Sequence, residues 1–362
     1  MSQASLIYNL SDPLELESGS KLNHVDISYE TYGTLNKTKS NAILICHALS
    51  ADAHVAQHPE NKTKGWWDDL VGNGKAIDTK KYFVICSNTI GSCRGSTGPM
   101  SINKSTKKPY GLKLPVITIG DMVSAQEALL NHLNIETLFA VVGGSMGGMQ
   151  ALEWSIRFPS KVKRCIAIAT TAKLSPQSLA FGAVGRNAIT SDPEWHKGDY
   201  YAKEAPQKGL AIARMIGHIT YLSEQGMLDK FGRNLQEKTD FGYDFSSDFQ
   251  IESYLKYQGD KFMTFFDANA YLYLSRAMSY FDLEKKYKSL NKAFKKSESK
   301  FLILSISSDW LYPSKQSKEI VKSLMTLSKD VTYAEIDSPF GHDGFLLECK
   351  KIGKVVKPFL GN

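Results

Sequence analysis

No stretch of the sequence reaches the roughly 18 uninterrupted apolar residues that indicate a membrane-spanning helix. The first residues, Met1–Ser5, also lack the basic start and apolar run of a secretory signal. These two absences favour a cytoplasmic protein that does not enter a membrane.

Cysteine is scarce, and its use argues against a disulfide-stabilised fold. The chain has 5 cysteines, an odd number, and they are scattered. Cys46, Cys86 and Cys165 lie inside apolar runs, where a free cysteine behaves as a small buried hydrophobic residue. The sequence therefore predicts free thiols and no structural disulfides.

Concentrated charge is also missing. The net charge of +7 arises from 44 Lys and Arg against 37 Asp and Glu, and the lysines are dispersed along the chain. Such dispersion is typical of a solvated surface and not of a nucleic-acid-binding face. We expect no nucleic-acid partner, although a mildly positive field would suit an anionic cosubstrate.

What the sequence does contain is a series of short apolar runs rich in β-branched residues, separated by helix-like segments such as Met122–Leu133. Continuous apolar strands that alternate with helices predict a mostly parallel sheet with helices on both faces, an α/β fold. The predicted strands are Ala42–Cys46, Tyr82–Cys86, Leu138–Val142, Cys165–Ala169, Phe301–Ile306 and Val331–Ile336.

This alternation stops between about residues 174 and 299. Amphipathic patterns without strand signals fill the interval, at Pro206–Ser223, Ile251–Gln258 and Ala268–Phe281. They predict a helical cap at 174–299, inserted between the first part of the α/β core at 1–173 and its second part at 300–362. The Lys- and Ser-rich segment Lys285–Lys300 is expected to be an exposed linker.

The segment Gly143–Gly148 reads G-G-S-M-G-G and lies between the predicted strand Leu138–Val142 and a helix-like stretch that ends near Phe158. A G-x-S-x-G motif between strand and helix is typical of the nucleophile elbow of the α/β-hydrolase fold. Glycines on either side permit the strained turn that presents the serine above the sheet. Ser145 is therefore the predicted nucleophile.

A glycine-rich phosphate-binding turn is the alternative interpretation of such a segment. Neither G-x-G-x-x-G nor a P-loop can be written at the elbow. The nearest P-loop look-alike, Asp69–Ala76, lacks the first glycine and the Ser or Thr after Lys75. The sequence thus favours acyl chemistry at Ser145.

A serine nucleophile needs a base and an orienting acid, which in this fold follow it in the order Asp or Glu, then His. His342 is the one histidine after the cap, and it follows the predicted strand Val331–Ile336. Asp309 follows the strand before that one, so it is the predicted acid. Asp337, at the end of the last strand, is the competing candidate, and a turn or helix cap is the ordinary role of such an aspartate.

The oxyanion of an acyl-transfer intermediate requires backbone donors. The N–H of Met146, directly after the nucleophile, is the first predicted donor, and Leu49, in the loop after Ala42–Cys46, is the second. His47 and His54 in that loop suggest a metal site, but a pair of histidines with H-x6-H spacing is a weak metal signal. We therefore expect no metal, and we expect His47 to brace the loop.

Several further segments have no general role in an α/β-hydrolase fold. Together with the elbow and the loop His47–His54, they span nearly the whole chain and resemble the homoserine O-acetyltransferase family. These segments are Gly65–Asp68, Gly74–Thr79, Gly95–Pro99, Ala213–Tyr221, Ser308–Trp310 and Gly341–Gly344.

The resemblance implies a triad of Ser145, Asp309 and His342 and substrate-binding roles for Arg214 and Asp343. An arginine and an aspartate would suit the carboxylate and ammonium of homoserine. It further implies no permanently bound cofactor, acetyl-CoA as the acyl donor, a place in methionine biosynthesis and a homodimer formed through the cap.

The sequence leaves alternatives open. Succinyl-CoA users share the same scaffold, and a succinyl donor would need a further cation for its distal carboxylate, for which Arg186 is a candidate. A serine esterase with the same triad is a second function, and a catalytically silent relative that acts as a binding module is a third. The intact Ser145, Asp309 and His342 argue against the last.

Overall fold

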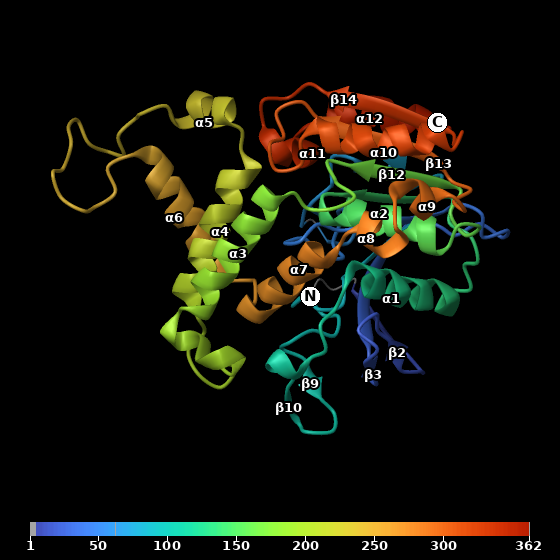
Figure 1. Cartoon of the computed structure of the whole chain (residues 1–362), viewed down its shortest axis with the longest axis horizontal. Coiled ribbons are helices and arrows are strands. Elements are labelled where there is room, and N and C mark those ends of the chain that lie inside the picture. Colours follow the sequence, from blue (N-terminus) through green and yellow to red (C-terminus); the bar gives the residue numbers. More distant parts are fainter. Residues whose placement is uncertain (1–4, 62, 362) are drawn as a thin grey trace.

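The computed structural model describes residues 5–61 and 63–361, and an eight-stranded sheet lies at its centre (Figure 1). All neighbours from β8 to β14 are parallel, whereas β1 pairs antiparallel with β4, and β4 with β8. In spatial order the strands are β1 (Leu6–Asn9), β4 (Asp26–Tyr32), β8 (Phe83–Ser87), β5 (Ala42–Cys46), β11 (Ala140–Gly144), β12 (Arg164–Ile168), β13 (Lys300–Ile306) and β14 (Val331–Ile336).

The inner parallel strands β5 and β11 are apolar throughout because both faces of the sheet are covered there, whereas the outer strand β14 carries Thr332 and Glu335. In β5, Ile43 and Ile45 belong to one core cluster, and Leu44 and Cys46 belong to the other. This alternation follows from the two-residue period of a strand. The predicted mostly parallel α/β sheet with two covered faces is confirmed.

Helices pack on each face. The face of Leu44 and Cys46 is covered by α1 (Ile119–His132), α2 (Met146–Arg157) and α10 (Ser314–Thr326), and the face of Ile43 and Ile45 by α12 (Cys349–Phe359). The start of α1 is encoded locally, since the Thr118 hydroxyl accepts from the Asp121 N–H and the Asp121 carboxylate accepts from the Thr118 N–H.

A group of helices lies between β12 and β13 in the sequence and beside the sheet in space (Figure 1). Its side chains share a core cluster with the sheet, and the Tyr273 hydroxyl donates to the Leu114 carbonyl. The division of the chain at 173/174 and 299/300 stays a prediction. The helices are α3 (Pro176–Thr190), α4 (Gln207–Tyr221), α5 (Glu224–Phe231), α6 (Gln250–Met263) and α7 (Ala268–Tyr280).

The expectation of an exposed linker at Lys285–Lys300 is wrong. The chain there forms two short helices, α8 (Leu283–Tyr287) and α9 (Leu290–Phe294), each begun by a capping side chain. Phe294 is fully buried and packs edge-on against Phe301, with ring centroids 5.7 Å apart. The lysines that suggested a linker lie on the exposed face of these helices. The overall composition of the segment therefore gave no sign of its buried apolar face.

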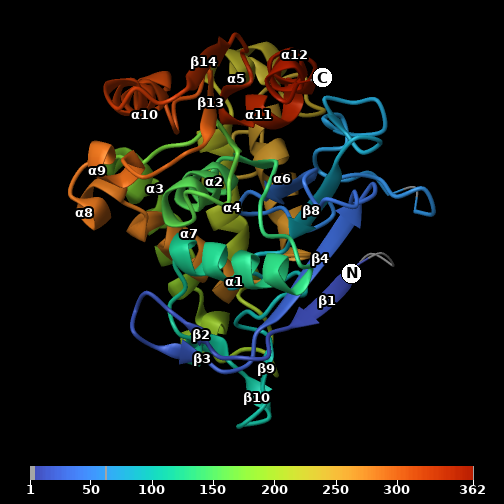
Figure 2. The ribbon, with the colours of Figure 1, turned by 90° about the vertical axis from the view of Figure 1, so that its right-hand side faces the viewer.

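The edge strand β1 and its neighbour β4 were not predicted, and they run side by side near the N-terminus (Figure 2). Among the described helices, none is long and apolar enough to span a bilayer. The remaining elements are short: β2 (Leu14–Glu15), β3 (Lys21–Leu22), β6 (Val71–Gly72), β7 (Ile77–Asp78), β9 (Ile102–Asn103), β10 (Lys108–Pro109), α11 (Gly344–Leu347) and the 3-10 turns Gly111–Lys113, Pro193–Gly198 and Gly341–Asp343.

Candidate active site

Ser145 stands at the turn between β11 and α2, with φ 57° and ψ −124°. A positive φ is strained for a residue with a Cβ, and it persists because the surrounding backbone is packed tightly. A Cβ added at Gly147 would lie 1.9 Å from the Cys46 carbonyl oxygen, so this position accepts only glycine. The strained turn predicted from the motif is present.

Ser145, His342 and Asp309 form one hydrogen-bonded chain. His342 Nε2 lies 2.8 Å from Ser145 Oγ, and His342 Nδ1 lies 2.7 Å from Asp309 Oδ2. The three residues follow β11, β14 and β13, whose carboxyl ends share one edge of the sheet. The geometry can pass a proton from the serine hydroxyl to the imidazole while the carboxylate fixes the ring.

Asp309 is held in place by its second oxygen. Oδ1 accepts from the N–H groups of Leu311 and Tyr312 at 3.0 and 2.9 Å, so the residue makes an Asx turn and also orients the histidine. The competing Asp337 is exposed, and its Oδ1 accepts from the Ser307 hydroxyl at 3.2 Å. The structure therefore places Asp309, and not Asp337, against His342.

The imidazole of His342 is enclosed by protein. Burial alone lowers its pKa, but the neighbouring Asp309 carboxylate outweighs that effect, and the pKa of His342 is raised above its ordinary value. Tyr312 packs edge-on against the ring, with centroids 5.0 Å apart. A raised pKa makes the histidine a stronger proton acceptor, as a general base requires.

The two predicted oxyanion donors lie at the start of α2 and in the loop after β5. Among the described residues, neither the Leu49 nor the Met146 amide donates a hydrogen bond to another protein group. Leu49 also lines the same pocket as Ser145. Both amides are thus available to an oxygen bound near the serine.

His47 braces this loop. Its Nδ1 donates to the Ala48 carbonyl at 2.7 Å, while its Nε2 accepts from the Thr89 N–H at 2.9 Å. Burial lowers the pKa of His47, in keeping with a neutral ring that donates through one nitrogen and accepts through the other. Gln150 of α2 adds a hydrogen bond to the His47 carbonyl at 3.2 Å, which ties the loop to the elbow helix.

The pocket at Ser145 is closed on its far side by the helices that follow β12. Its wall mixes apolar and hydroxyl-bearing side chains, which suits a small acyl group and a polar acceptor. The lining residues are Leu49, Ser145, Leu174, Ser178, Phe181, Gly182, Ile216, Gly217, Thr220, Tyr221, Tyr271, Ser275, Met278, Ser279, Leu311 and Tyr312.

Arg214 extends from α4 between two aromatic rings. Its guanidinium carbon lies 4.6 Å from the Phe262 ring centroid and 5.7 Å from that of Tyr221. One nitrogen reaches Ser50 Oγ at 3.5 Å, while the buried Nε has no hydrogen-bond partner in the described part of the chain. Sequence reasoning missed Ser50, Phe262 and Tyr221 here, because nothing in their local pattern signals a partnership with Arg214.

Asp343 follows His342 directly and is enclosed as well. Burial raises the pKa of Asp343, and the nearby His342 and Arg214 charges oppose that rise. Its side chain makes no cap hydrogen bond to α11, so capping does not account for it. Within the described residues, neither Asp343 nor Arg214 has an ion-pair partner in contact, so both charges can engage a ligand.

Arg186 lies on α3, where its guanidinium donates to Ser279 Oγ at 3.3 Å. Ser279 lines the pocket at Ser145, whereas Arg186 is not among the lining residues and reaches the pocket wall only through this hydrogen bond. Burial and the charge of Arg276 lower the pKa of Arg186.

The sequence matches the alpha/beta hydrolase fold family over residues 41–348. The homoserine O-acetyltransferase of Methanosalsum zhilinae is 55% identical over 356 residues, which cover 98% of this chain and 72% of the relative. That of Methanohalobium evestigatum is also 55% identical, over 98% of this chain and 73% of the relative.

Solved structures agree with these relatives. The homoserine O-acetyltransferase from Bacillus anthracis superposes with a TM-score of 0.93 at 32% identity, covering 99% of this chain and 97% of its own. Esterase E22 superposes with a TM-score of 0.91 at 30% identity, covering 98% and 99%. By fold and by full-length similarity, this chain belongs to the homoserine O-acetyltransferase family of α/β-hydrolase-fold proteins.

Proposed function

We propose that the protein is a homoserine O-acetyltransferase, which transfers the acetyl group of acetyl-CoA to the γ-hydroxyl of L-homoserine. One observation carries the proposal beyond family membership. The hydrogen-bonded chain Ser145–His342–Asp309 lies next to two half-buried opposite charges, Arg214 and Asp343, which make no ion pair within the described residues. A hydrolase acting on neutral esters needs no such pair, whereas an amino-acid acceptor does.

In the first half-reaction, His342 accepts the hydroxyl proton as Ser145 Oγ attacks the thioester carbonyl carbon of acetyl-CoA. The backbone N–H groups of Leu49 and Met146 stabilise the negative charge on the carbonyl oxygen. The carbon–sulfur bond then breaks, the imidazolium returns its proton to the CoA thiolate, and an acetyl-serine remains. Acetyl-CoA serves as cosubstrate, and no permanently bound cofactor is involved.

In the second half-reaction, homoserine occupies the space vacated by CoA. His342 accepts the proton of the γ-hydroxyl while that oxygen attacks the acetyl-serine carbonyl. Collapse of the intermediate breaks the bond to Ser145 Oγ, which regains its proton from His342. The product, O-acetylhomoserine, is an activated amino acid that fits a step of methionine biosynthesis.

Recognition of homoserine follows from its two charges. The Arg214 guanidinium would hold the α-carboxylate, and the Asp343 carboxylate would hold the α-ammonium. Both side chains are half-buried, and charge-assisted hydrogen bonds are stronger there than on a fully exposed surface. With both ends fixed, the γ-hydroxyl is directed at His342.

Steady-state assays with homoserine and each of two donors test this function. We expect turnover with acetyl-CoA and little with succinyl-CoA, because the pocket wall presents hydroxyls and apolar groups, and Arg186 is not among the lining residues. Turnover with succinyl-CoA in the absence of turnover with acetyl-CoA would overturn the acetyl assignment and favour Arg186 as the cation for the distal carboxylate.

Substituting Arg214 by glutamine should raise the KM for homoserine by about 10- to 100-fold, the equivalent of losing charged hydrogen bonds of about 1.5–3 kcal/mol. The burst of CoA released in the first half-reaction should be unchanged, because homoserine takes no part in it. The matched control is Arg233→Gln, which removes an arginine that also stacks on an aromatic ring, that of Phe249. A loss of burst as large as the KM effect would contradict the role of Arg214.

The likeness to esterase E22 makes ester hydrolysis the second candidate function. The two functions differ in how the acetyl-serine partitions between water and homoserine. For a transferase, added homoserine diverts the acetyl group into O-acetylhomoserine and suppresses free acetate. Acetate release that is unaffected by homoserine would establish an esterase.

We also propose a cytoplasmic homodimer formed through the helices between β12 and β13. The support is a set of large apolar side chains exposed on these helices, Leu179, Val184, Ile212, Ile219, Leu228, Tyr257 and Tyr280. Sedimentation at micromolar concentration should show the dimer, and a monomer throughout would refute it.

A further inference from the structure

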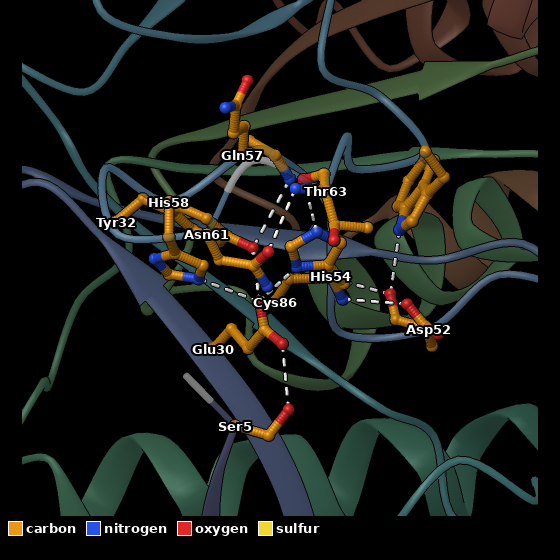
Figure 3. A network of polar contacts seen from close by, with 12 residues as sticks. Ser5, Glu30, Tyr32, Asp52, His54, Gln57, His58, Asn61, Thr63 and Cys86 are labelled. Atoms are coloured by element: carbon orange, nitrogen blue, oxygen red, sulfur yellow. Dashed lines mark hydrogen bonds and ion pairs between the residues drawn. The ribbon is translucent and has the colours of Figure 1, made fainter. Parts of the chain in front are cut away.

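Three side chains that can ligate a metal, Glu30, His54 and His58, lie close together (Figure 3). None of them belongs to the catalytic triad. Glu30 comes from β4, and His54 and His58 come from the loop after β5. His54 Nδ1 and His58 Nε2 each lie 2.9 Å from Glu30 Oε2. The Glu30 side chain is 1% exposed, so a charge on it must be balanced locally.

If both histidines are neutral, the cluster has fewer N–H protons than its short contacts to acceptor oxygens require. Glu30 Oε2 also accepts from the Tyr32 hydroxyl at 2.7 Å, so three groups converge on one oxygen. His54 Nε2 lies 3.0 Å from the Thr63 carbonyl oxygen, which only accepts. Both nitrogens of His54 therefore face acceptors, although a neutral imidazole carries one proton.

A divalent cation in place of the proton on His54 Nδ1 resolves this mismatch. Neutral His54 would keep its single proton on Nε2 and donate it to Thr63, which is the arrangement that orients metal-bound histidines in proteins. A carboxylate also lies near His58, whose Nδ1 is 4.0 Å from Glu60 Oε1, a distance longer than a hydrogen bond. Its ring is fixed by stacking on Tyr32, with centroids 4.3 Å apart.

We propose that Glu30, His54 and His58 form a binding site for a divalent transition-metal ion of the zinc type. Two imidazole nitrogens and one carboxylate oxygen are ligands that zinc prefers, and three protein ligands leave a further position for water. Glu30 and His54 also line a surface cleft, through which an ion and its water can enter.

No metal was expected from the sequence, and His58, which lies four residues after His54, was overlooked. His47, which was paired with His54 as a possible ligand, is engaged with Ala48 and Thr89 instead. The third ligand, Glu30, is 24 residues away from His54 in the chain. The pairing of β4 with β8 brings it into place.

A metal here would fix the loop that carries the oxyanion donor. The backbone N–H of His54 donates to Asp52 Oδ1 at 2.9 Å, and Arg94 forms an ion pair with the Asp52 carboxylate at 2.8 Å. Trp66 Nε1 donates to the Asp52 carbonyl at 2.8 Å. Since Leu49 is three residues before Asp52, an ion at His54 would hold this part of the loop against β4.

The first test is zinc binding by protein without an affinity tag, stripped of metal with a chelator and titrated with ZnCl2 in a calorimeter. We expect about one zinc ion per chain and a higher midpoint of thermal unfolding with zinc. Glu30→Gln and His58→Gln should each weaken zinc binding at least about 10-fold, since even outer partners of metal ligands have effects of that size. His196→Gln is the matched control, because His196 also lies beside a glutamate, Glu194, at 3.3 Å.

Binding that both variants retain, or the absence of saturable binding, would overturn the proposal in favour of a doubly protonated His54 paired with Glu30. If a variant fails to fold, wild-type crystals soaked in ZnCl2 decide the matter. An anomalous difference peak at about 2.0–2.2 Å from Glu30 and the two histidine nitrogens supports the site. A map with no peak between these three side chains refutes it.

Discussion

In a Ser145→Ala variant, kcat/KM for acetyl transfer should fall by about 10⁴-fold or more, and the burst of CoA should disappear. The substitution removes Ser145 Oγ, the only protein atom that the proposed chemistry joins to the acetyl group. Direct attack of homoserine on the thioester would then have to proceed without a covalent intermediate. Rapid-quench measurement of CoA release, together with mass spectrometry of the intact protein for the acetyl adduct, checks this expectation.

Ser105→Ala provides the control, because Ser105 is an exposed residue in the turn between β9 and β10. Its activity and thermal unfolding should match those of the wild type. If Ser145→Ala retained full transfer activity, the protein would either transfer the acetyl group directly to homoserine or act as a binding module, with another protein catalysing the reaction. Either result would end the acyl-serine mechanism.

Substituting Asp309 by asparagine should lower kcat by about 10⁴-fold with little change in the fold, as expected when the base of a triad loses its orienting carboxylate. The cause is the hydrogen bond of 2.7 Å between Asp309 Oδ2 and His342 Nδ1. An asparagine that donates its amide there favours the opposite tautomer, and Nε2 then cannot accept the serine proton.

The pH dependence gives this substitution a signature of its own. His342 must be unprotonated to act as a base, so kcat/KM for the first half-reaction falls as the pH drops through the pKa of His342. Burial lowers that pKa and the Asp309 charge raises it, with a net increase in the wild type. Removing the charge lowers the pKa, and the acid limb of the profile should move to lower pH.

Asp337→Asn is the matched control, because Asp337 follows the neighbouring strand but is exposed and hydrogen-bonded to Ser307. It should leave both kcat and the acid limb in place. A loss of activity from Asp337→Asn that exceeds the loss from Asp309→Asn would transfer the orienting role to Asp337.

Local pattern was sufficient to find the strands of the parallel region. The predicted bounds of Ala42–Cys46 and Val331–Ile336 agree with β5 and β14, because a short apolar run with flanking turn residues has few other ways to fold. The strand β4, which lies between β1 and β8, escaped notice because it carries polar side chains, such as Glu30, that form hydrogen bonds with other side chains. Its partners come from distant parts of the chain, which no local pattern reveals.

Glu348, with φ −92° and ψ 34°, separates the helices α11 and α12. The break turns the chain so that the two helices make different contacts. The Phe345 and His342 ring centroids are 5.4 Å apart, and Ile352 packs in the core beneath the sheet. Amphipathic spacing continues across the break, so the sequence pattern alone predicts one helix.

The sequence by itself determined the alternating fold and the strained serine turn, since each depends on residues close together in the chain. It also determined the order of nucleophile, acid and base, which can be read along the chain without knowing their contacts. Only the tertiary structure decided which groups meet. Ser145 and His342 are 197 residues apart, and their contact depends on β11 and β14 ending at the same edge of one sheet. The cluster at Glu30 likewise requires strand pairing, because hydrogen-bond and ligand geometry is set in space and not along the chain.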